Sequence, residues 1–362
     1  MYYNNKKFSD VHIEPTNACN FTCWMCPREI MTRNSGFMDL EKFKELTLDL
    51  HSTNLLKHLH FGGFGEPTLH PSFIEMVRYV KDQTNLMVSL TTNGSKFTQR
   101  KFIQDLIDTK IDKIIISIRH TVSEKMACSM PSTLKDEDFI DGITNLIKLN
   151  LELDSPVEID LAFLKETFYS KHILGIKKEE YLDNNYIDNI LEKISNLVKY
   201  KIPTFKQLTG NFSSNFSRIH VLHPVKGLKI RFDGLGAWTT AVKKYKDSKS
   251  CNLASYGNCL GMDTHFSIYW NGDVSTCCAD FDVKNVLGNA FESDNILSIL
   301  SNEKAQHFVN NLRNNRMPSM TCQMCRGGST HREKWVNVLG TILTKKKNYK
   351  IWNDVLHEQL KN

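Results

Sequence analysis

Three cysteines near the start of the chain have the spacing of ligands to one metal centre. Cys19, Cys23 and Cys26 form a C-x3-C-x2-C segment directly after the apolar-alternating run 11–16. A cubane iron–sulfur cluster ligated only by cysteine takes four thiolates. Three thiolates would leave one iron open to a small chelating molecule. A structural zinc loop and a chance group of buried thiols are the alternative interpretations.

A second group of cysteines lies in the last third of the chain. Cys259 and Cys277 flank an Asn-Gly pair at 271–272, and Cys322 and Cys325 form a C-x2-C pair. Asn-Gly between apolar runs predicts a β-hairpin, which would bring the first two thiols together. The C-x2-C pair would complete a closed four-thiolate site, with a four-thiol zinc ribbon as the alternative.

Three further cysteines lie outside this pattern. Cys278 is adjacent to Cys277 and could replace it as a ligand, although the glycine spacing favours Cys277. Cys128 and Cys251 are expected to be unligated, with Cys251 kept as a possible substitute in the second site. Asp280 would either orient a cluster or close a turn.

The composition is that of a globular protein in a reducing compartment. Of 362 residues, 41% are hydrophobic and 24% are charged, with a net charge of +6. Basic runs such as 345–347 are expected to be solvated faces, which makes a nucleic-acid partner unexpected. No apolar run predicts a membrane span or a signal peptide, so we expect a cytoplasmic protein. There, ten cysteines indicate metal binding rather than disulfides.

Strand and helix patterns alternate through the first 165 residues. We expect helices at 40–50, 71–81, 97–109 and 136–149, and strands at 11–16, 55–61, 86–90, 113–119 and 157–164. This alternation predicts an α/β fold with a parallel sheet. Polar residues and glycines follow the strands, at the carboxyl edge where parallel sheets place their active or binding sites. No G-x-G-x-x-G follows the first strand, which argues against dinucleotide binding.

The rest of the chain divides into smaller units. The first domain is expected to span 1–240 and to end with a strand at 227–232. Its segment 165–218, with a helix at 181–200, is interpreted as an insertion or lid. A linker at 243–250 leads to a β-hairpin and helix unit at 251–330, and 331–362 is expected to be a helical tail.

The first domain resembles the radical S-adenosylmethionine (SAM) superfamily over residues 10–240. Cys19, Cys23 and Cys26 match its cluster ligands, which implies a partial (β/α)6 TIM barrel, a 4Fe-4S cluster and SAM. The residues that match SAM-binding positions of the family are Met25 near the adenine, Gly63, Gly65, Glu66 and Pro67 at the amino group, and Asn93, Gly94 and Ser117 at the methionyl or ribose group. Ordinary turn and strand roles are the alternatives.

One departure from the family pattern follows the fourth strand. Relatives often carry an acidic residue there, whereas this chain has Arg119 and His120. The ribose contact is therefore in doubt. Arg119 would face the SAM carboxylate or a substrate, or form a salt bridge at the barrel rim.

The C-terminal unit resembles the short, twitch form of the SPASM domain, which implies a second, auxiliary 4Fe-4S cluster. By resemblance to radical SAM dehydrogenases, we expect oxidation of a secondary alcohol on a sugar, aminocyclitol or nucleotide-sugar. The electron donor would be a flavodoxin or ferredoxin. Arg119, His120 and Arg231 are candidate acceptors of the hydroxyl proton.

Several other functions are compatible with the same motifs. A SPASM-type peptide maturase would crosslink or epimerise a precursor, and a radical SAM dehydratase or epimerase would begin with the same hydrogen abstraction. A zinc-stabilised binding module is the non-catalytic alternative, but it leaves the open cysteine triad and the Gly-Glu-Pro motif unexplained.

Overall fold

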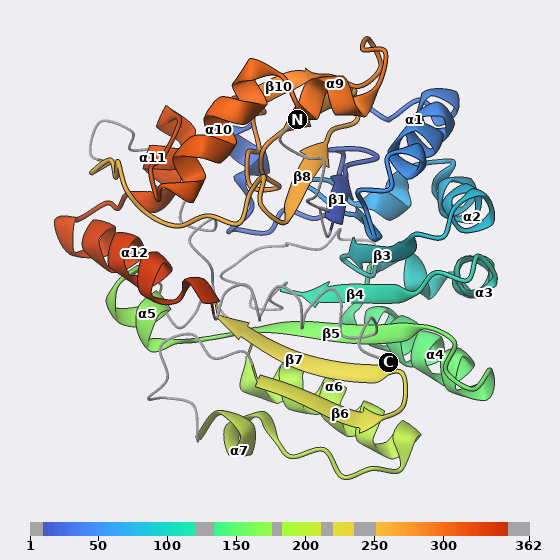
Figure 1. Ribbon diagram of the computed structural model, residues 1–362. Coiled ribbons are helices and arrows are strands. Elements are labelled where there is room, and N and C mark those ends of the chain that lie inside the picture. Colours follow the sequence, from blue (N-terminus) through green and yellow to red (C-terminus); the bar gives the residue numbers. More distant parts are fainter. Residues whose placement is uncertain (1–9, 120–133, 176–182, 211–219, 235–250, 347–362) are drawn as a thin grey trace.

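The computed structural model describes residues 10–119, 134–175, 183–210, 220–234 and 251–346 (Figure 1). His120 and Cys128 lie outside these ranges, as do the expected linker at 243–250 and the end of the expected tail. In the described part of the chain, none of the helices has the length and hydropathy that a membrane span needs.

The centre of the fold is a row of six parallel strands, as the partial barrel requires. In spatial order they are β1 (Asp10–Ile13), β2 (His58–Phe61), β3 (Met87–Thr92), β4 (Lys113–Ile118), β5 (Glu158–Lys165) and β7 (Leu228–Gly234). The helices of the wall are α1 (Leu40–Ser52), α2 (Phe73–Gln83), α3 (Arg100–Asp108), α4 (Asp136–Glu152) and α6 (Asn184–Val198). Short 3-10 helices are η1 (Pro27–Ile30), η2 (Pro67–Leu69) and η3 (Ser95–Thr98).

The two faces of the strands differ in polarity. Val11 and Ile13 of β1 belong to the main hydrophobic core, together with the alternate residues of the neighbouring strands and the apolar faces of the helices. His12 of β1 instead contacts the rings of His60 and His265 on the other face of the sheet. Alternation along a strand sends successive side chains to opposite faces, so the barrel interior is lined by polar residues.

The segment 165–218 contributes a helix to the barrel wall. Asp183 caps α6 by accepting a hydrogen bond from the Asn185 amide. The apolar residues Ile187, Ile190 and Ile194 then pack into the main core, and α6 contacts α4. This part of the segment therefore continues the outer helical layer. The segment also holds α5 (Phe168–His172) and α7 (Phe205–Gly210), and residues 211–219 lie outside the described ranges.

The predicted hairpin at 266–276 is present, with Gly272 in its turn at φ +88°. Its first strand, β8 (His265–Ile268), pairs in parallel with β1, and β9 (Asp273–Ser275) and β10 (Val286–Asn289) follow outward. On the far edge, β6 (His220–Val225) pairs antiparallel with β7. The result is one ten-stranded sheet that includes the hairpin. The remaining helices are α9 (Ile296–Leu300), α10 (Glu303–Arg313), α11 (Met320–Arg326) and α12 (His331–Leu343).

Candidate iron–sulfur and SAM sites

The first cysteine loop leaves the end of β1 and is held closed by its own backbone. The Cys26 amide donates to the carbonyl of Cys23 at 2.9 Å. Arg28 donates from Nη1 to the carbonyls of Cys19 and Phe21, at 3.1 and 3.0 Å. Burial raises the pKa of all three thiols, that of Cys23 to about 12. These thiols stay protonated at neutral pH until a metal displaces the protons.

Two loops from neighbouring strands meet the cysteine loop. Asn93, at the end of β3, donates from Nδ2 to Oδ1 of Asn20 at 2.9 Å and lies 3.8 Å from Sγ of Cys19. Gly65, after β2, lies so close to residues 16–18 that an added Cβ would be 2.1 Å from the Thr16 carbonyl oxygen. The structure therefore brings the cysteine triad, the 63–67 motif and the Asn93–Gly94 turn together, as the sequence predicted.

Glu66 holds these two loops to each other. Its buried carboxylate accepts hydrogen bonds at 2.6 Å from Oγ1 of Thr68, Oγ1 of Thr92 and the Asn93 amide. Burial raises the pKa of the Glu66 carboxyl group. The Glu66 carboxylate thus joins the loops that follow β2 and β3.

The other predicted SAM contacts have ordinary structural positions. Met25 is buried and packs with Leu164, at the end of β5, and with Trp24. Pro67 begins η2, and Ser117 lies half-buried on β4. Gly94 has φ +80°, which favours glycine. A role for these residues toward SAM remains a prediction.

Of the three predicted proton acceptors, Arg119 and Arg231 lie in the described chain. Arg231 donates from Nε to Asp160 at 3.2 Å and from Nη1 to Asp233 at 2.5 Å. Burial would lower its pKa, but Asp160 and Asp233 outweigh that effect and raise it. A guanidinium so paired is a poor proton acceptor. Burial lowers the pKa of Arg119, opposed by Asp233 and by the nearby thiols of Cys23 and Cys26.

The second group of cysteines converges on one pocket. Its lining includes the four predicted ligands Cys259, Cys277, Cys322 and Cys325. Cys322 and Cys325 lie on α11, whose N-cap Ser319 accepts a hydrogen bond from the Cys322 amide. The amides of Gly261 and Ala279 donate to the sulfurs of Cys259 and Cys277, at 3.4 and 3.2 Å. The donor set suits a fully ligated iron–sulfur cluster.

Arg326 and His265 lie beside these cysteines and were not identified from the sequence. Arg326 follows Cys325 directly and donates from Nη1 to its sulfur at 3.5 Å. His265, on β8, lies with Nε2 3.8 Å from Sγ of Cys278, and one ligand atom each from His265, Cys277 and Cys278 lie within 4.8 Å of one another. Asp280 accepts hydrogen bonds from Ser275 and from the amides of 284 and 285, so it closes the turn.

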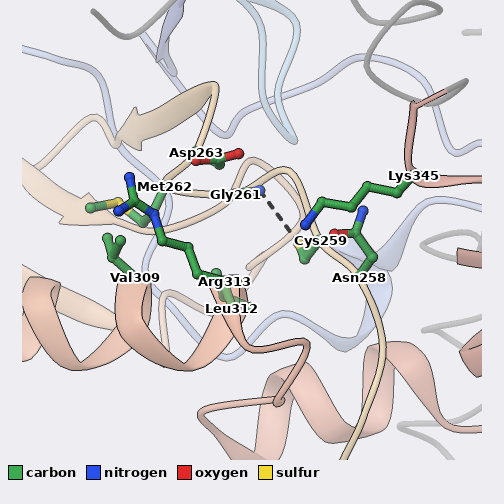
Figure 2. Close-up of a pocket in the computed structure, with 9 residues that line it drawn as sticks. All are labelled: Asn258, Cys259, Gly261, Met262, Asp263, Val309, Leu312, Arg313 and Lys345. Carbon is green, nitrogen blue, oxygen red and sulfur yellow. Dashed lines mark hydrogen bonds between the residues drawn. The ribbon is translucent and has the colours of Figure 1, made fainter. Parts of the chain in front are cut away.

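A second pocket borders Cys259 (Figure 2). It is lined by Val309, Leu312 and Arg313 of α10 and by Lys345, with Asp263 opposite. Burial raises the pKa of the Asp263 carboxyl group, and the cations Arg313 and Lys345 oppose that shift. Cys259 therefore lines both this pocket and the pocket that contains the other three predicted ligands.

Comparison with known proteins identifies both units. Residues 13–161 match the Radical SAM superfamily, and residues 259–326 match SPASM, an iron-sulfur cluster-binding domain. The chain therefore has a radical SAM domain, followed by a C-terminal SPASM domain. The radical SAM domain binds a 4Fe-4S cluster and SAM, and the SPASM domain binds auxiliary iron–sulfur clusters.

Two curated relatives illustrate the range of the similarity. A tungsten-containing aldehyde ferredoxin oxidoreductase cofactor-modifying protein of Pyrococcus furiosus is 24% identical over 196 residues, covering 52% of this chain and 54% of the relative. The S-adenosyl-L-methionine-dependent 2-deoxy-scyllo-inosamine dehydrogenase of Niallia circulans is 30% identical over 117 residues, or 31% of this chain and 46% of the relative. This chain thus spans about half the length of these relatives.

Among solved structures, Streptococcus suis SuiB bound to S-adenosylmethionine aligns with a TM-score of 0.50 and 14% identity. The alignment covers 84% of this chain and 68% of SuiB. At this identity the likeness shows the fold.

Proposed function

We propose that this protein oxidises a secondary alcohol of a sugar, aminocyclitol or nucleotide-sugar, with a single auxiliary 4Fe-4S cluster as the electron acceptor. The observation that carries the proposal is the convergence of Cys259, Cys277, Cys322 and Cys325 on one pocket. Four thiolates leave no iron open for substrate, so a cluster held there suits electron transfer. The partial similarity to an aminocyclitol dehydrogenase supports the same reaction.

The position of the auxiliary site also supports this function. The hairpin that carries Cys277 pairs its strand β8 with β1, the strand that leads into the first cysteine loop. The auxiliary site is therefore built onto the same sheet as the SAM site. An electron left on a substrate at the barrel mouth would thus pass between two sites that share one sheet.

The chain's own residues would position the reactants. When bound, the first cluster and SAM together supply hydrogen-atom abstraction from an unactivated C–H bond. Cys19, Cys23 and Cys26 would hold that cluster, and the backbone of the 63–65 turn would receive the SAM ammonium group. Asn93 would position the cysteine loop through its hydrogen bond to Asn20. Arg119 interacts electrostatically with Cys23 and Cys26, and we assign it to an anionic group of SAM or substrate.

The experiment is anaerobic reconstitution followed by incubation with SAM, a flavodoxin or ferredoxin reducing system and a panel of alcohols deuterated at the carbinol carbon. The panel contains 2-deoxy-scyllo-inosamine, related sugars and nucleotide-sugars. We expect deuterium in 5′-deoxyadenosine and a carbonyl product lighter by two hydrogens. The Cys19/Cys23/Cys26→Ala variant should give neither product.

A second variant separates oxidation from abstraction. Cys322/Cys325→Ala should still transfer deuterium into 5′-deoxyadenosine but should lose the carbonyl product. Deuterium transfer with an epimerised or dehydrated product in the wild type would replace the dehydrogenase with an epimerase or dehydratase. Modification of a precursor peptide, with every alcohol left unreacted, would establish a maturase instead.

A further inference from the structure

The interior of the barrel contains buried polar and titratable side chains at positions where apolar side chains could pack. TIM-barrel interiors are usually filled by branched apolar side chains. Here the inward face of β1, β2 and β3 carries Asp10, His58, His60 and Ser89, all buried. Burying polar groups is costly unless each forms hydrogen bonds, so this arrangement must be stabilised by its own bonds.

These side chains form one continuous series of hydrogen bonds. Oγ1 of Thr91 lies 3.1 Å from Nε2 of His60, and Nδ1 of His60 lies 2.6 Å from Oγ of Ser89. The same Ser89 oxygen lies 2.7 Å from Nε2 of His58, whose Nδ1 lies 2.5 Å from Oδ1 of Asp10. Every member between the ends has both a donor and an acceptor in the series.

The carboxylate at one end sets the direction of every bond. In the neutral form of His58, the proton on Nδ1 is donated to Asp10, and Nε2 accepts from the Ser89 hydroxyl. Ser89 then accepts from Nδ1 of His60, and His60 accepts at Nε2 from the Thr91 hydroxyl. Each donor points toward Asp10, as in the Ser-His-Asp arrangement of hydrolases, and the Thr91 oxygen is left as the acceptor at the other end.

The surroundings keep His60 neutral. Burial is the largest cause and lowers the pKa of His60 to about 3, against the opposing effect of Asp10. Lys113 is paired with Glu158 at 2.6 Å, and the ring of His12 packs 4.9 Å from that of His60. A neutral imidazole with one donor and one acceptor nitrogen is the form that passes a proton.

The upper end of the series reaches the SAM-binding edge. Thr91 is half-buried, and it immediately precedes Thr92 and Asn93, which bind Glu66 in the loop cluster beside the first cysteines. The lower end, Asp10, is fully buried at the start of β1. The series therefore runs from the reaction edge of the sheet into its interior.

We propose that Thr91, His60, Ser89 and His58 form a proton relay, and that Asp10 is the final acceptor of the proton lost by the substrate hydroxyl. This inference rests on the proposed alcohol oxidation. The substrate O–H bond breaks and a new O–H bond forms at Thr91, whose own proton passes to Nε2 of His60. One proton moves along each following bond, and Asp10 becomes a neutral carboxylic acid.

The hydrogen atom and the remaining electron leave by the routes of the proposed reaction, so the relay carries only a proton. After the product leaves, the same steps in reverse return the proton to solvent at the barrel mouth. This assignment supplies the base that Arg231 does not, because Arg231 is engaged with Asp160 and Asp233.

The test that needs no substrate is hydrogen exchange of the His58 Nδ1 proton, followed by NMR on protein labelled with 15N-histidine. In a relay this proton exchanges through Thr91, so Ser89→Ala should slow its exchange about tenfold or more. The matched control is Ser267→Ala, a buried serine on β8 outside the series, which should leave the rate unchanged. In a merely structural network, Ser89→Ala would leave the rate unchanged or raise it by loosening the fold, which would overturn the proposal.

Thr91→Val provides a second interruption at the less buried end, in case Ser89→Ala fails to fold. It should slow the same exchange, and a rate equal to wild type would likewise count against the relay. Near-UV circular dichroism checks the fold of each variant.

The catalytic arm uses any alcohol of the panel that wild type oxidises. Ser89→Ala and Thr91→Val should lower kcat about 100-fold, the scale of general-base catalysis, with KM unchanged and Ser267→Ala at the wild-type rate. An unchanged kcat would refute the role of Asp10 as acceptor. If wild type oxidises no alcohol, the proposed function fails, and the exchange measurement alone decides whether the relay exists.

Discussion

Arg33 forms a two-pronged ion pair with Glu14, with Nη1 2.5 Å from Oε1 and Nη2 2.6 Å from Oε2. Glu14 follows β1 and is 2% exposed, while Arg33 follows the first cysteine loop and is 13% exposed. The same guanidinium donates from Nε to the carbonyl of Phe281 at 2.6 Å and lies 4.8 Å from the ring centroid of Tyr269. One side chain thus joins the barrel, the first cysteine loop and the auxiliary unit.

Neighbouring contacts strengthen this connection. Thr32 donates from its amide and hydroxyl to the Asp282 carboxylate, at 2.7 and 2.9 Å. The amide of Phe64, in the predicted SAM motif, donates to Oε2 of Glu14 at 3.1 Å. Loops from the first cysteine site and the auxiliary unit therefore meet at Glu14 and Arg33.

Arg33→Gln should destabilise the protein and weaken the first cluster. Removing one member of a buried ion pair leaves the other charge without compensation, which costs about 3 kcal/mol. Urea unfolding of the metal-free protein measures this loss. In a Cys322/Cys325→Ala background, iron content reports the first cluster alone and should also fall. The exposed Arg332 provides the control Arg332→Gln. Wild-type stability in Arg33→Gln would contradict the role of the pair.

Acidification should destabilise the protein through His60. Its pKa is about 3 in the folded protein against an ordinary 6.5, so the unfolded chain binds the extra proton between these pH values. The free energy of unfolding contributed by His60 should therefore fall as pH drops below about 6.5, approaching about 1.4 kcal/mol per pH unit. Urea unfolding at several pH values, in wild type and His60→Gln, isolates this slope. Parallel pH profiles for the two proteins would show that His60 does not titrate in this way.

Gly65→Ala should disrupt the SAM-binding edge. The added Cβ would lie 2.1 Å from the Thr16 carbonyl oxygen and 2.7 Å from that of Ala18, a separation that backbone atoms cannot accept without moving. We expect a lower melting temperature of the metal-free protein and weaker SAM binding after reconstitution. Gly340→Ala is the matched control, because nothing lies within 4 Å of its Cβ on α12. It should stabilise the helix by about 1 kcal/mol.

Arg326 should set the reduction potential of the auxiliary cluster. Burial would lower the pKa of its guanidinium, but Cys325, Cys259 and Cys277 outweigh this and raise it. A cation at this position favours the reduced, more negative cluster, so Arg326→Gln should lower the midpoint potential by about 50 mV. Redox titration followed by electron paramagnetic resonance measures the shift. Arg326→Lys should retain most of the potential, and the exposed Arg316→Gln serves as control. A higher potential in Arg326→Gln would contradict the electrostatic assignment.

The sequence was sufficient for those features that depend on local pattern. Asp39 caps α1 by accepting from the Lys42 amide, as its position before an apolar periodic run predicts. The Asn-Gly turn also forms the expected hairpin. These features are determined within a few residues of chain, where turn and capping preferences are strong.

What the sequence did not predict depends on contacts between distant residues. Glu66 accepts hydrogen bonds from Thr92 and Asn93, which lie at the end of the next strand, and no local pattern predicts these contacts. Pairing of β8 with β1 joins residues about 250 positions apart, and nothing in either segment specifies that register. The ion pair of Arg33 with Glu14 and the interior series from Thr91 to Asp10 are hidden in the same way, because only the closed barrel brings their members together.

The choice between the adjacent thiols Cys277 and Cys278 can be decided by metal content. Cys277 lines the pocket shared by Cys259, Cys322 and Cys325, and its sulfur accepts the Ala279 amide at 3.2 Å. The Cys278 sulfur instead lies 3.8 Å from Nε2 of His265. Cys277→Ser should therefore reduce the reconstituted protein from about eight irons to about four, whereas Cys278→Ser should retain about eight. Loss of iron in Cys278→Ser with retention in Cys277→Ser would reverse the assignment and place the cluster beside His265.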